Sequence, residues 1–207
     1  MDTTAVDPST PLTTGILLFD GFEELDALGP WEVFGAATVQ FPHDRVLGVA
    51  PVARELRAAK GLRVVPDCEL AGAPPLPPGT TITSSGGSGA RDAAKDPRVL
   101  EWLRERSARA RWLSSVCTGA LLLETAGLLR GRRATTHWAY CDELEQRGVT
   151  VVRGERYVRD GNVVTAAGVS AGIDMALWLL GQLRGEAAAR ETQRYMEYAP
   201  EPPFGEG

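Results

Sequence analysis

Short apolar runs alternate with longer helix-forming stretches along most of the chain, and this alternation narrows the folds that it can adopt. The runs 14–19, 46–53 and 111–116 are continuous and brief, which is typical of buried strands. The stretches 23–39 and 96–110 have helical character, and the second opens with the start signal Asp-Pro. Strands that alternate with helices predict an α/β sandwich with a mainly parallel sheet. Functional sites in such sheets collect where the carboxyl end of a strand runs into a helix.

The rest of the chain supplies further elements of both kinds, without an internal repeat. Residues 1–13, rich in Thr, Pro and Asp, predict a disordered lead-in, so that a single domain spans 14–207. The prolines of 71–80 predict a loop, and the tail 197–207 is expected to be irregular. Further strands are expected within 61–70, at 80–85, at 132–136 and within 149–168, and further helices at 118–129, 137–148 and 170–185.

The composition of the 207 residues argues against several classes of function. A net charge of −5 disfavours a general binder of nucleic-acid phosphates, which would carry a basic stripe. No apolar run approaches the length that spans a membrane, and the polar opening residues lack the apolar segment of a signal peptide. Two histidines and three scattered cysteines give no metal-ligand spacing, so no metal is expected. We therefore expect a cytoplasmic protein with reduced thiols.

Cys117 lies at the junction of a strand and a helix in the sequence SSVCTGALLLETAGLL, residues 114–129. Such a turn can expose a nucleophile, and the small Gly119 lets strand and helix pack closely. A thiol at a helix N-terminus faces unpaired backbone N–H groups and the positive end of the helix dipole, which favour the thiolate. Most free cysteines are instead small buried hydrophobes. The residues alone leave both interpretations open.

Two other strand ends carry candidate groups. Asp26 lies among apolar residues in EELDALGP, where burial would raise the pKa of its carboxyl group. A helix-capping aspartate is the alternative, and the neighbouring Glu23 and Glu24 are expected to be more exposed. The stretch SSGGSGA, residues 84–90, offers glycine N–H groups that can approach a substrate closely, although a flexible turn is the simpler interpretation.

The histidines and two tryptophans have plain interpretations. His137 is expected to cap a helix, and His43 is expected to lie in a surface loop. Trp138 and Trp178 are expected to pack in the core or at an interface.

Together these segments resemble the DJ-1/ThiJ/PfpI superfamily, and specifically its isonitrile (isocyanide) hydratase branch. The likeness lies in LLFDGFEELDALGPWEVF, in SSVCTGALLLETAGLLRGRRATTHWAY and in ERYVRDGNVVTAAGVSAGIDMALWLL, and it covers residues 14–204. The resemblance implies a flavodoxin-like three-layer sandwich with a nucleophile elbow, a sharp strand-to-helix turn that carries the reactive residue. It also implies a homodimer that acts on a small isonitrile and needs no cofactor.

The resemblance assigns roles to individual residues. Cys117 takes the position of the nucleophile, and Asp26 takes that of the acid that contacts the thiol and handles protons. Thr118 follows the nucleophile where PfpI-type proteases have a histidine, so a cysteine protease is a poor interpretation. Four further positions are expected to support the site by binding the substrate or its developing charge: Gly86, Gly87, Gly168 and Val169.

The implied reaction adds water to an isocyanide through a cysteine thioimidate and gives an N-substituted formamide. In one departure, Ser84-Ser85 precede Gly86-Gly87 where relatives carry a proline, which would add hydroxyl groups to the site wall. Two alternatives remain. Relatives of the glyoxalase or deglycase type carry Glu where this chain has Asp26, and a non-catalytic sensor would use Cys117 for oxidation or ligand response.

Overall fold

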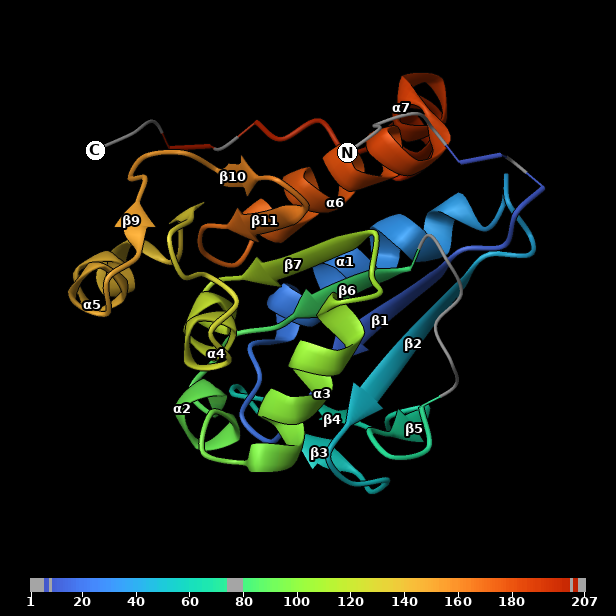
Figure 1. Ribbon diagram of the computed structural model, residues 1–207. Helices are drawn as coiled ribbons and strands as arrows, with labels where there is room; N and C mark the ends of the chain where they lie inside the picture. Colours follow the sequence, from blue (N-terminus) through green and yellow to red (C-terminus); the bar gives the residue numbers. More distant parts are fainter. Residues whose placement is uncertain (1–5, 8, 74–79, 202, 205–207) are drawn as a thin grey trace.

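A computed structural model describes residues 6–7, 9–73, 80–201 and 203–204 of the chain (Figure 1). Its centre is a seven-stranded sheet. The strands are β1 (Thr13–Leu17), β2 (Arg45–Ala50), β5 (Cys68–Glu69), β6 (Thr81–Ser84), β7 (Trp112–Val116), β10 (Tyr157–Asp160) and β11 (Val163–Ala166). Their order is β10-β11-β7-β6-β1-β2-β5. All neighbours pair in parallel except β10 and β11, which form an antiparallel hairpin at one edge.

The central strands are buried on both faces, which explains their short and continuous apolar pattern. Some of the hydroxyl groups on these strands are paired within the sheet, whereas those of Thr81 and Ser115 have no partner among the described residues. Thr83 and Ser114 on the neighbouring strands β6 and β7 share a side-chain hydrogen bond of 2.9 Å, and Ser114 also donates to the Ile82 carbonyl oxygen at 3.1 Å. Pairing removes most of the cost of burying these polar groups.

Helices cover both faces of the sheet and complete three layers (Figure 1). One outer layer contains α1 (Glu24–Ala37), α6 (Ala171–Arg184) and α7 (Glu186–Tyr195). The other contains α2 (Ala90–Ala93), α3 (Pro97–Ser107) and α4 (Gly119–Thr125). An apolar core fills the space on each side of the sheet. The predicted three-layer α/β sandwich is confirmed.

Two small sheets and two short helices extend from this body. β3 (Leu56–Arg57) and β4 (Arg63–Val64) form an antiparallel pair, whereas β8 (Arg133–Ala134) and β9 (Thr150–Val151) pair in parallel. The 3-10 helix η1 (Trp138–Tyr140) and α5 (Cys141–Gln146) follow β8. Figure 1 shows α5 and β9 beside α4, at the end of the sheet toward which β7 points.

Several expected elements differ in extent. The strand expected within 61–70 is two short strands, and the helix expected to reach residue 129 ends at Thr125. Pro30 lies in the interior of α1. Helices α2 and α7 were not foreseen. Within the described ranges, no helix is both long and apolar enough to cross a membrane.

The described part of the N-terminal lead-in is attached to the domain. The Val6 N–H group donates to the Leu183 carbonyl oxygen at 2.8 Å, and the Arg184 guanidinium donates to the carbonyl oxygens of Asp7 and Thr10. These residues therefore differ from the disorder expected for 1–13, although residues 1–5 and 8 lie outside the described residues. So do positions 74–79 of the expected loop at 71–80.

Candidate active site

Cys117 lies in the tight turn between β7 and α4, with a backbone φ of 56°. This left-handed conformation is strained for a residue other than glycine, and such strain persists only where the surroundings impose it. Here the Cys117 N–H group donates to the Ala167 carbonyl oxygen at 2.8 Å, and its own carbonyl oxygen accepts the Thr136 hydroxyl at 2.7 Å. A Cβ at Gly119 would collide with the Ser84 carbonyl group, so α4 packs directly against the end of β6. The elbow geometry is confirmed.

Asp26 enters the same site from the first turn of α1. Its side chain is fully buried, and Oδ2 accepts the Gly86 N–H group at 3.0 Å. Burial raises the pKa of the Asp26 carboxyl group to about 7, and the negative charge of Glu23 acts in the same direction. The Gly86 N–H group and the Cys117 thiol act against this rise by hydrogen bonding. The predicted rise in pKa is confirmed, and the helix-capping alternative is wrong because this side chain accepts from a distant loop.

The second oxygen of Asp26, Oδ1, is buried and has no hydrogen-bond partner of ordinary geometry among the described residues. A buried acceptor without a partner is costly, and it favours the protonated carboxyl group or an approaching donor. The two other acids of this segment lie further out, where Glu23 pairs with Lys60 and Glu24 accepts the Lys60 backbone N–H at 2.8 Å. Asp26 is therefore the acid that faces Cys117.

The Cys117 thiol is not a preformed thiolate. Burial raises its pKa to about 12, and the nearby Asp26 carboxylate adds to the rise. Hydrogen bonds from Thr118 and from the Val169 N–H group act in the opposite direction but are outweighed. The expectation that the helix N-terminus favours the thiolate is wrong here, because loss of solvation and a neighbouring negative charge dominate. The thiol and carboxyl group interact, so they titrate as a pair.

The glycine loop after β6 positions the side chains of Asp26 and Thr118. The Gly87 N–H group donates to Thr118 Oγ1 at 2.9 Å, while Gly86 donates to Asp26. A Cβ at Gly86 would lie 2.6 Å from the Thr118 nitrogen and 2.8 Å from Asp26 Oδ2, so only glycine fits. The two N–H groups expected to hold substrate or developing charge are thus already engaged by side chains of the site. A direct role of either glycine in substrate binding stays a prediction.

Gly168 and Val169 approach Cys117 from the segment after β11. Val169 adopts a left-handed φ of 46°, and its N–H group is one of the donors to the thiol. Gly168 packs against the imidazole of His137, where a Cβ would lie 2.5 Å from Cδ2. Asp26, Thr118 and Val169 therefore interact with the Cys117 thiol, and the three glycines lie next to these residues. The roles of all these residues toward a substrate stay predictions.

The two serines that replace the proline of relatives do not behave as expected. Both side chains are fully buried. The Ser85 hydroxyl donates to the Leu17 carbonyl oxygen at 2.5 Å, and the Ser84 hydroxyl lies 3.5 Å from the Ser85 carbonyl oxygen. Both hydroxyl groups are turned toward the backbone instead of lining the site wall.

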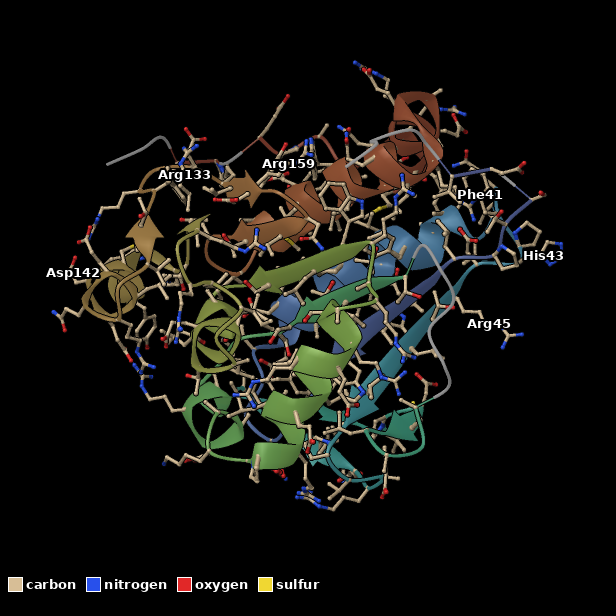
Figure 2. All side chains as sticks on the ribbon, viewed as in Figure 1. Phe41, His43, Arg45, Arg133, Asp142 and Arg159 are labelled. Atoms are coloured by element: carbon tan, nitrogen blue, oxygen red, sulfur yellow. The ribbon has the colours of Figure 1, made fainter. Side chains whose placement is uncertain are left out.

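The histidines behave as expected, and the two tryptophans differ in burial. His137 precedes η1 and caps it, since Nδ1 accepts the Ala139 N–H at 3.2 Å. His43 is exposed and lies at the opposite end of the molecule from α5 (Figure 2). Trp178 packs edge-on against Trp112 with ring centroids 5.4 Å apart. Trp138 is 81% exposed, so it does not pack in the core, and its place at an interface stays a prediction.

Sequence reasoning missed a cleft beside the elbow. It has a volume of about 450 Å³ and is lined by Cys141 and by residues 135–138, 153–156 and 167–169. These three segments are separate loops, and no local pattern signals that they meet. No group of three His, Cys, Asp or Glu side chains in the described parts of the chain is arranged to hold a metal ion.

Comparisons with known proteins agree with this geometry. The model of the DJ-1/PfpI family matches residues 14–182. The chain is 40% identical over 196 residues to an isonitrile hydratase of Pseudomonas putida, covering 95% of this chain and 82% of that protein. It is 25% identical over 179 residues to a Parkinson disease protein 7 homolog of Danio rerio, covering 86% and 93%.

Solved structures show the same architecture. A THiJ/PfpI family protein from Pseudomonas syringae superposes with a TM-score of 0.84 at 34% identity, covering 93% of this chain and 77% of that one. Drosophila melanogaster DJ-1beta, at 18% identity, shares the fold with a TM-score of 0.82 over 92% of this chain and 100% of its own. The expected resemblance is confirmed, and the chain belongs to the DJ-1/PfpI family.

Proposed function

We propose that this protein is an isonitrile hydratase, which adds water to an isocyanide and releases an N-substituted formamide. The observation that carries the proposal is the buried pair of Cys117 and Asp26, a nucleophile beside a carboxyl group whose pKa is raised to about 7. The 40% identity to the isonitrile hydratase of Pseudomonas putida supports the same reaction. The chemistry uses only side chains, backbone groups and water.

In the first half of the reaction, the terminal carbon of the isocyanide receives both a sulfur atom and a proton. The Asp26 carboxylate takes the proton from the Cys117 thiol as the sulfur attacks this carbon. Asp26 then returns the proton to the same carbon, and the product is a thioimidate in which carbon is bonded to sulfur, hydrogen and nitrogen. Hydrogen bonds from Thr118 and from the Val169 N–H group stabilise the sulfur as it gains negative charge.

In the second half, water replaces the sulfur. Asp26, now a carboxylate, takes a proton from water as the water oxygen adds to the thioimidate carbon, and it passes this proton to the nitrogen. As the tetrahedral intermediate collapses, the carbon–sulfur bond breaks, Asp26 takes the proton of the hydroxyl group and transfers it to the released sulfur, and the thiol and the carboxylate are restored. The sum of both halves is one isocyanide plus one water, converted to one formamide. The same carboxyl group acts as base and acid in turn, which a pKa of about 7 favours near neutral pH.

Two alternatives have less support. The DJ-1-type relative from Danio rerio is 25% identical, well below the isonitrile hydratase, and the acid of this chain is Asp26. A cysteine protease would need a histidine beside the nucleophile. Thr118 occupies the following position, and His137 is committed to capping η1 through Nδ1.

We also propose that the protein is a homodimer in the cytoplasm. Four exposed apolar side chains on α1 and on the β3–β4 hairpin suit an interface: Leu25, Leu28, Leu62 and Val65. All three cysteines are free, as expected in a reducing compartment. Sedimentation at several protein concentrations measures the oligomeric state.

The reaction is tested by mixing the purified protein with an aryl and an alkyl isocyanide and following formamide by chromatography. Formamide should form with the unchanged protein and with Cys68→Ala, a matched control at a partly exposed cysteine. Cys117→Ala should form none. Undiminished turnover by Cys117→Ala would remove the thioimidate from the mechanism. No formamide from any isocyanide, with Cys117 still oxidised by peroxide, would favour the sensor.

A further inference from the structure

The cleft beside the elbow shares its wall with the reactive cysteine. Val169 lines the cleft and donates its N–H group to the Cys117 thiol. Thr136 also lines it, and its hydroxyl donates to the Cys117 carbonyl oxygen at 2.7 Å. Neither Cys117 nor Asp26 lines the cleft itself. The cleft is therefore placed to receive a part of the substrate that is attached to the reacting group but does not react.

An isocyano group is linear, so the substituent on its nitrogen extends directly away from the carbon under attack. With that carbon at Cys117, a substituent that extends past Val169 enters the cleft. A volume of about 450 Å³ is large enough for a ring and far larger than a methyl or ethyl group needs. Binding energy for a large substituent must therefore come from the walls of the cleft.

Trp138 is the largest apolar surface on those walls. Its side chain is 81% exposed, which is unusual for tryptophan, a residue that is mostly buried in folded proteins. The turn that carries it is fixed, because His137 caps η1 and packs against Gly168. The His137 and Trp138 rings lie with centroids 5.4 Å apart at an interplanar angle of 32°. An exposed aromatic ring on a fixed turn can cover a flat ligand without first being ordered.

Two guanidinium groups and one carboxylate line the cleft, and only the guanidinium groups form ion pairs; Glu155 is exposed and has no ion-pair partner among the described residues. Arg153 binds Asp142 at 2.6 Å and Glu145 at 2.9 Å, and Asp142 extends outward from α5 (Figure 2). Arg156 binds Asp174 at 2.6 Å. Neither guanidinium group is poised to hold an anionic substituent, because each would have to leave a carboxylate partner. The unpaired Glu155 carboxylate would also repel an anion, so an anionic substituent is disfavoured, and an uncharged substituent would be held by apolar and aromatic contact.

We propose that Trp138 determines substrate specificity by stacking on an aromatic substituent held in the cleft, so that aryl isocyanides are preferred over small alkyl isocyanides. This inference rests on the proposed function and adds a substrate class to it. Trp138 does not touch the reacting atoms, so its contribution is to the binding of the substituent. An aromatic ring that loses its stacking partner should bind about tenfold more weakly, which corresponds to about 1.4 kcal/mol.

The test compares phenyl and ethyl isocyanide as substrates of the unchanged protein, Trp138→Ala and Trp138→Phe. Trp138→Ala should raise KM for phenyl isocyanide about tenfold and leave kcat/KM for ethyl isocyanide unchanged. Trp138→Phe should restore most of the loss because it keeps an aromatic face. Tyr195→Ala is the matched control, since Tyr195 is an aromatic side chain on α7 that is 61% exposed and lies outside the cleft.

A second measurement does not depend on turnover. Binding of N-phenylformamide, the expected product, is measured by calorimetry with Cys117→Ala and with Cys117→Ala/Trp138→Ala. The double variant should bind about tenfold more weakly. This binding experiment separates the two proposals: absent turnover with Trp138-dependent binding would refute the hydratase and keep the aryl site.

Two results would overturn the inference. Equal losses of kcat/KM for both isocyanides would mean that Trp138 supports the turn rather than the substituent. A smaller sedimenting species for Trp138→Ala than for the unchanged protein would mean that Trp138 belongs to an interface between copies of the chain.

Discussion

Replacing Asp26 by asparagine should abolish turnover and stabilise the fold, and the gain in stability should depend on pH. Asp26 is fully buried, and burial raises the pKa of its carboxyl group from 3.8 to about 7. In the unfolded chain this pKa returns to its ordinary value. Between the two values the native state therefore binds more protons than the unfolded state, and the free energy of unfolding falls as pH rises.

The rise in the pKa of Asp26 from 3.8 to about 7 corresponds to about 4 kcal/mol, which the native state loses between about pH 4 and pH 8. Asparagine cannot ionise, and its side-chain oxygen can still accept the Gly86 N–H group. The difference in unfolding free energy between Asp26→Asn and the unchanged protein should therefore grow by about 4 kcal/mol across this window. The Cys117 thiol, with its pKa raised to about 12, stays protonated in the native state throughout.

Urea unfolding at pH 4, 6 and 8, followed by tryptophan fluorescence, measures this difference. Glu32→Gln is the matched control, because it removes one carboxylate from an exposed position of the same helix and shows what the loss of a carboxylate alone contributes. A difference for Asp26→Asn that stays constant from pH 4 to pH 8 would refute the reasoning. The pKa of the Asp26 carboxyl group would then lie near its ordinary value, and its carboxylate would be too weak a base to take the proton from the Cys117 thiol efficiently.

Three further changes test the surroundings of this pair. Gly86→Ala places a methyl group 2.6 Å from the Thr118 nitrogen. This variant should lose formamide production, and urea titrations should show an unfolding free energy that is lower by about 1–3 kcal/mol. Thr118→Val removes the acceptor of the 2.9 Å hydrogen bond from the Gly87 N–H group, which should lower the unfolding free energy by about 1 kcal/mol and lower kcat. Thr118→Ser should keep both the stability and kcat. Alkylation of Cys117 by iodoacetamide should keep accelerating up to at least pH 10, because its pKa is raised to about 12; a plateau near pH 8 would contradict this.

Local patterns were sufficient to predict the pieces of the site but not their contacts. The apolar run before Cys117 and the helix-forming residues after it predict the elbow, and the apolar neighbours of Asp26 predict its burial. Asp26 and Gly86 are 60 residues apart, and they meet because β1 and β6 are adjacent parallel strands whose carboxyl ends share one edge of the sheet. Strand order is a property of the whole chain, so no single segment contains it.

Helix α7 shows the opposite case, in which a signal was present and was not used. Glu186 and Arg190 are four residues apart and form an ion pair, and the buried Ala188 and Thr192 have the same spacing. This pattern of one charged and one buried face predicts a helix from sequence alone. The cleft carries no comparable signal, because its three segments come together only through the arrangement of β8, β10 and β11.

Local and tertiary effects on the protonation of the Cys117 thiol oppose each other, and their balance affects the reaction that the thiol can perform. A helix N-terminus favours the thiolate, but burial and the Asp26 carboxylate favour the thiol, and the second pair of effects dominates. A permanent thiolate beside a permanent carboxylate could attack an isocyanide but could not then protonate the carbon. A thiol beside a carboxyl group with a pKa of about 7 holds the required proton between them. Sulfur becomes nucleophilic only as Asp26 receives that proton, and Asp26 then has it ready for the carbon that the sulfur has attacked.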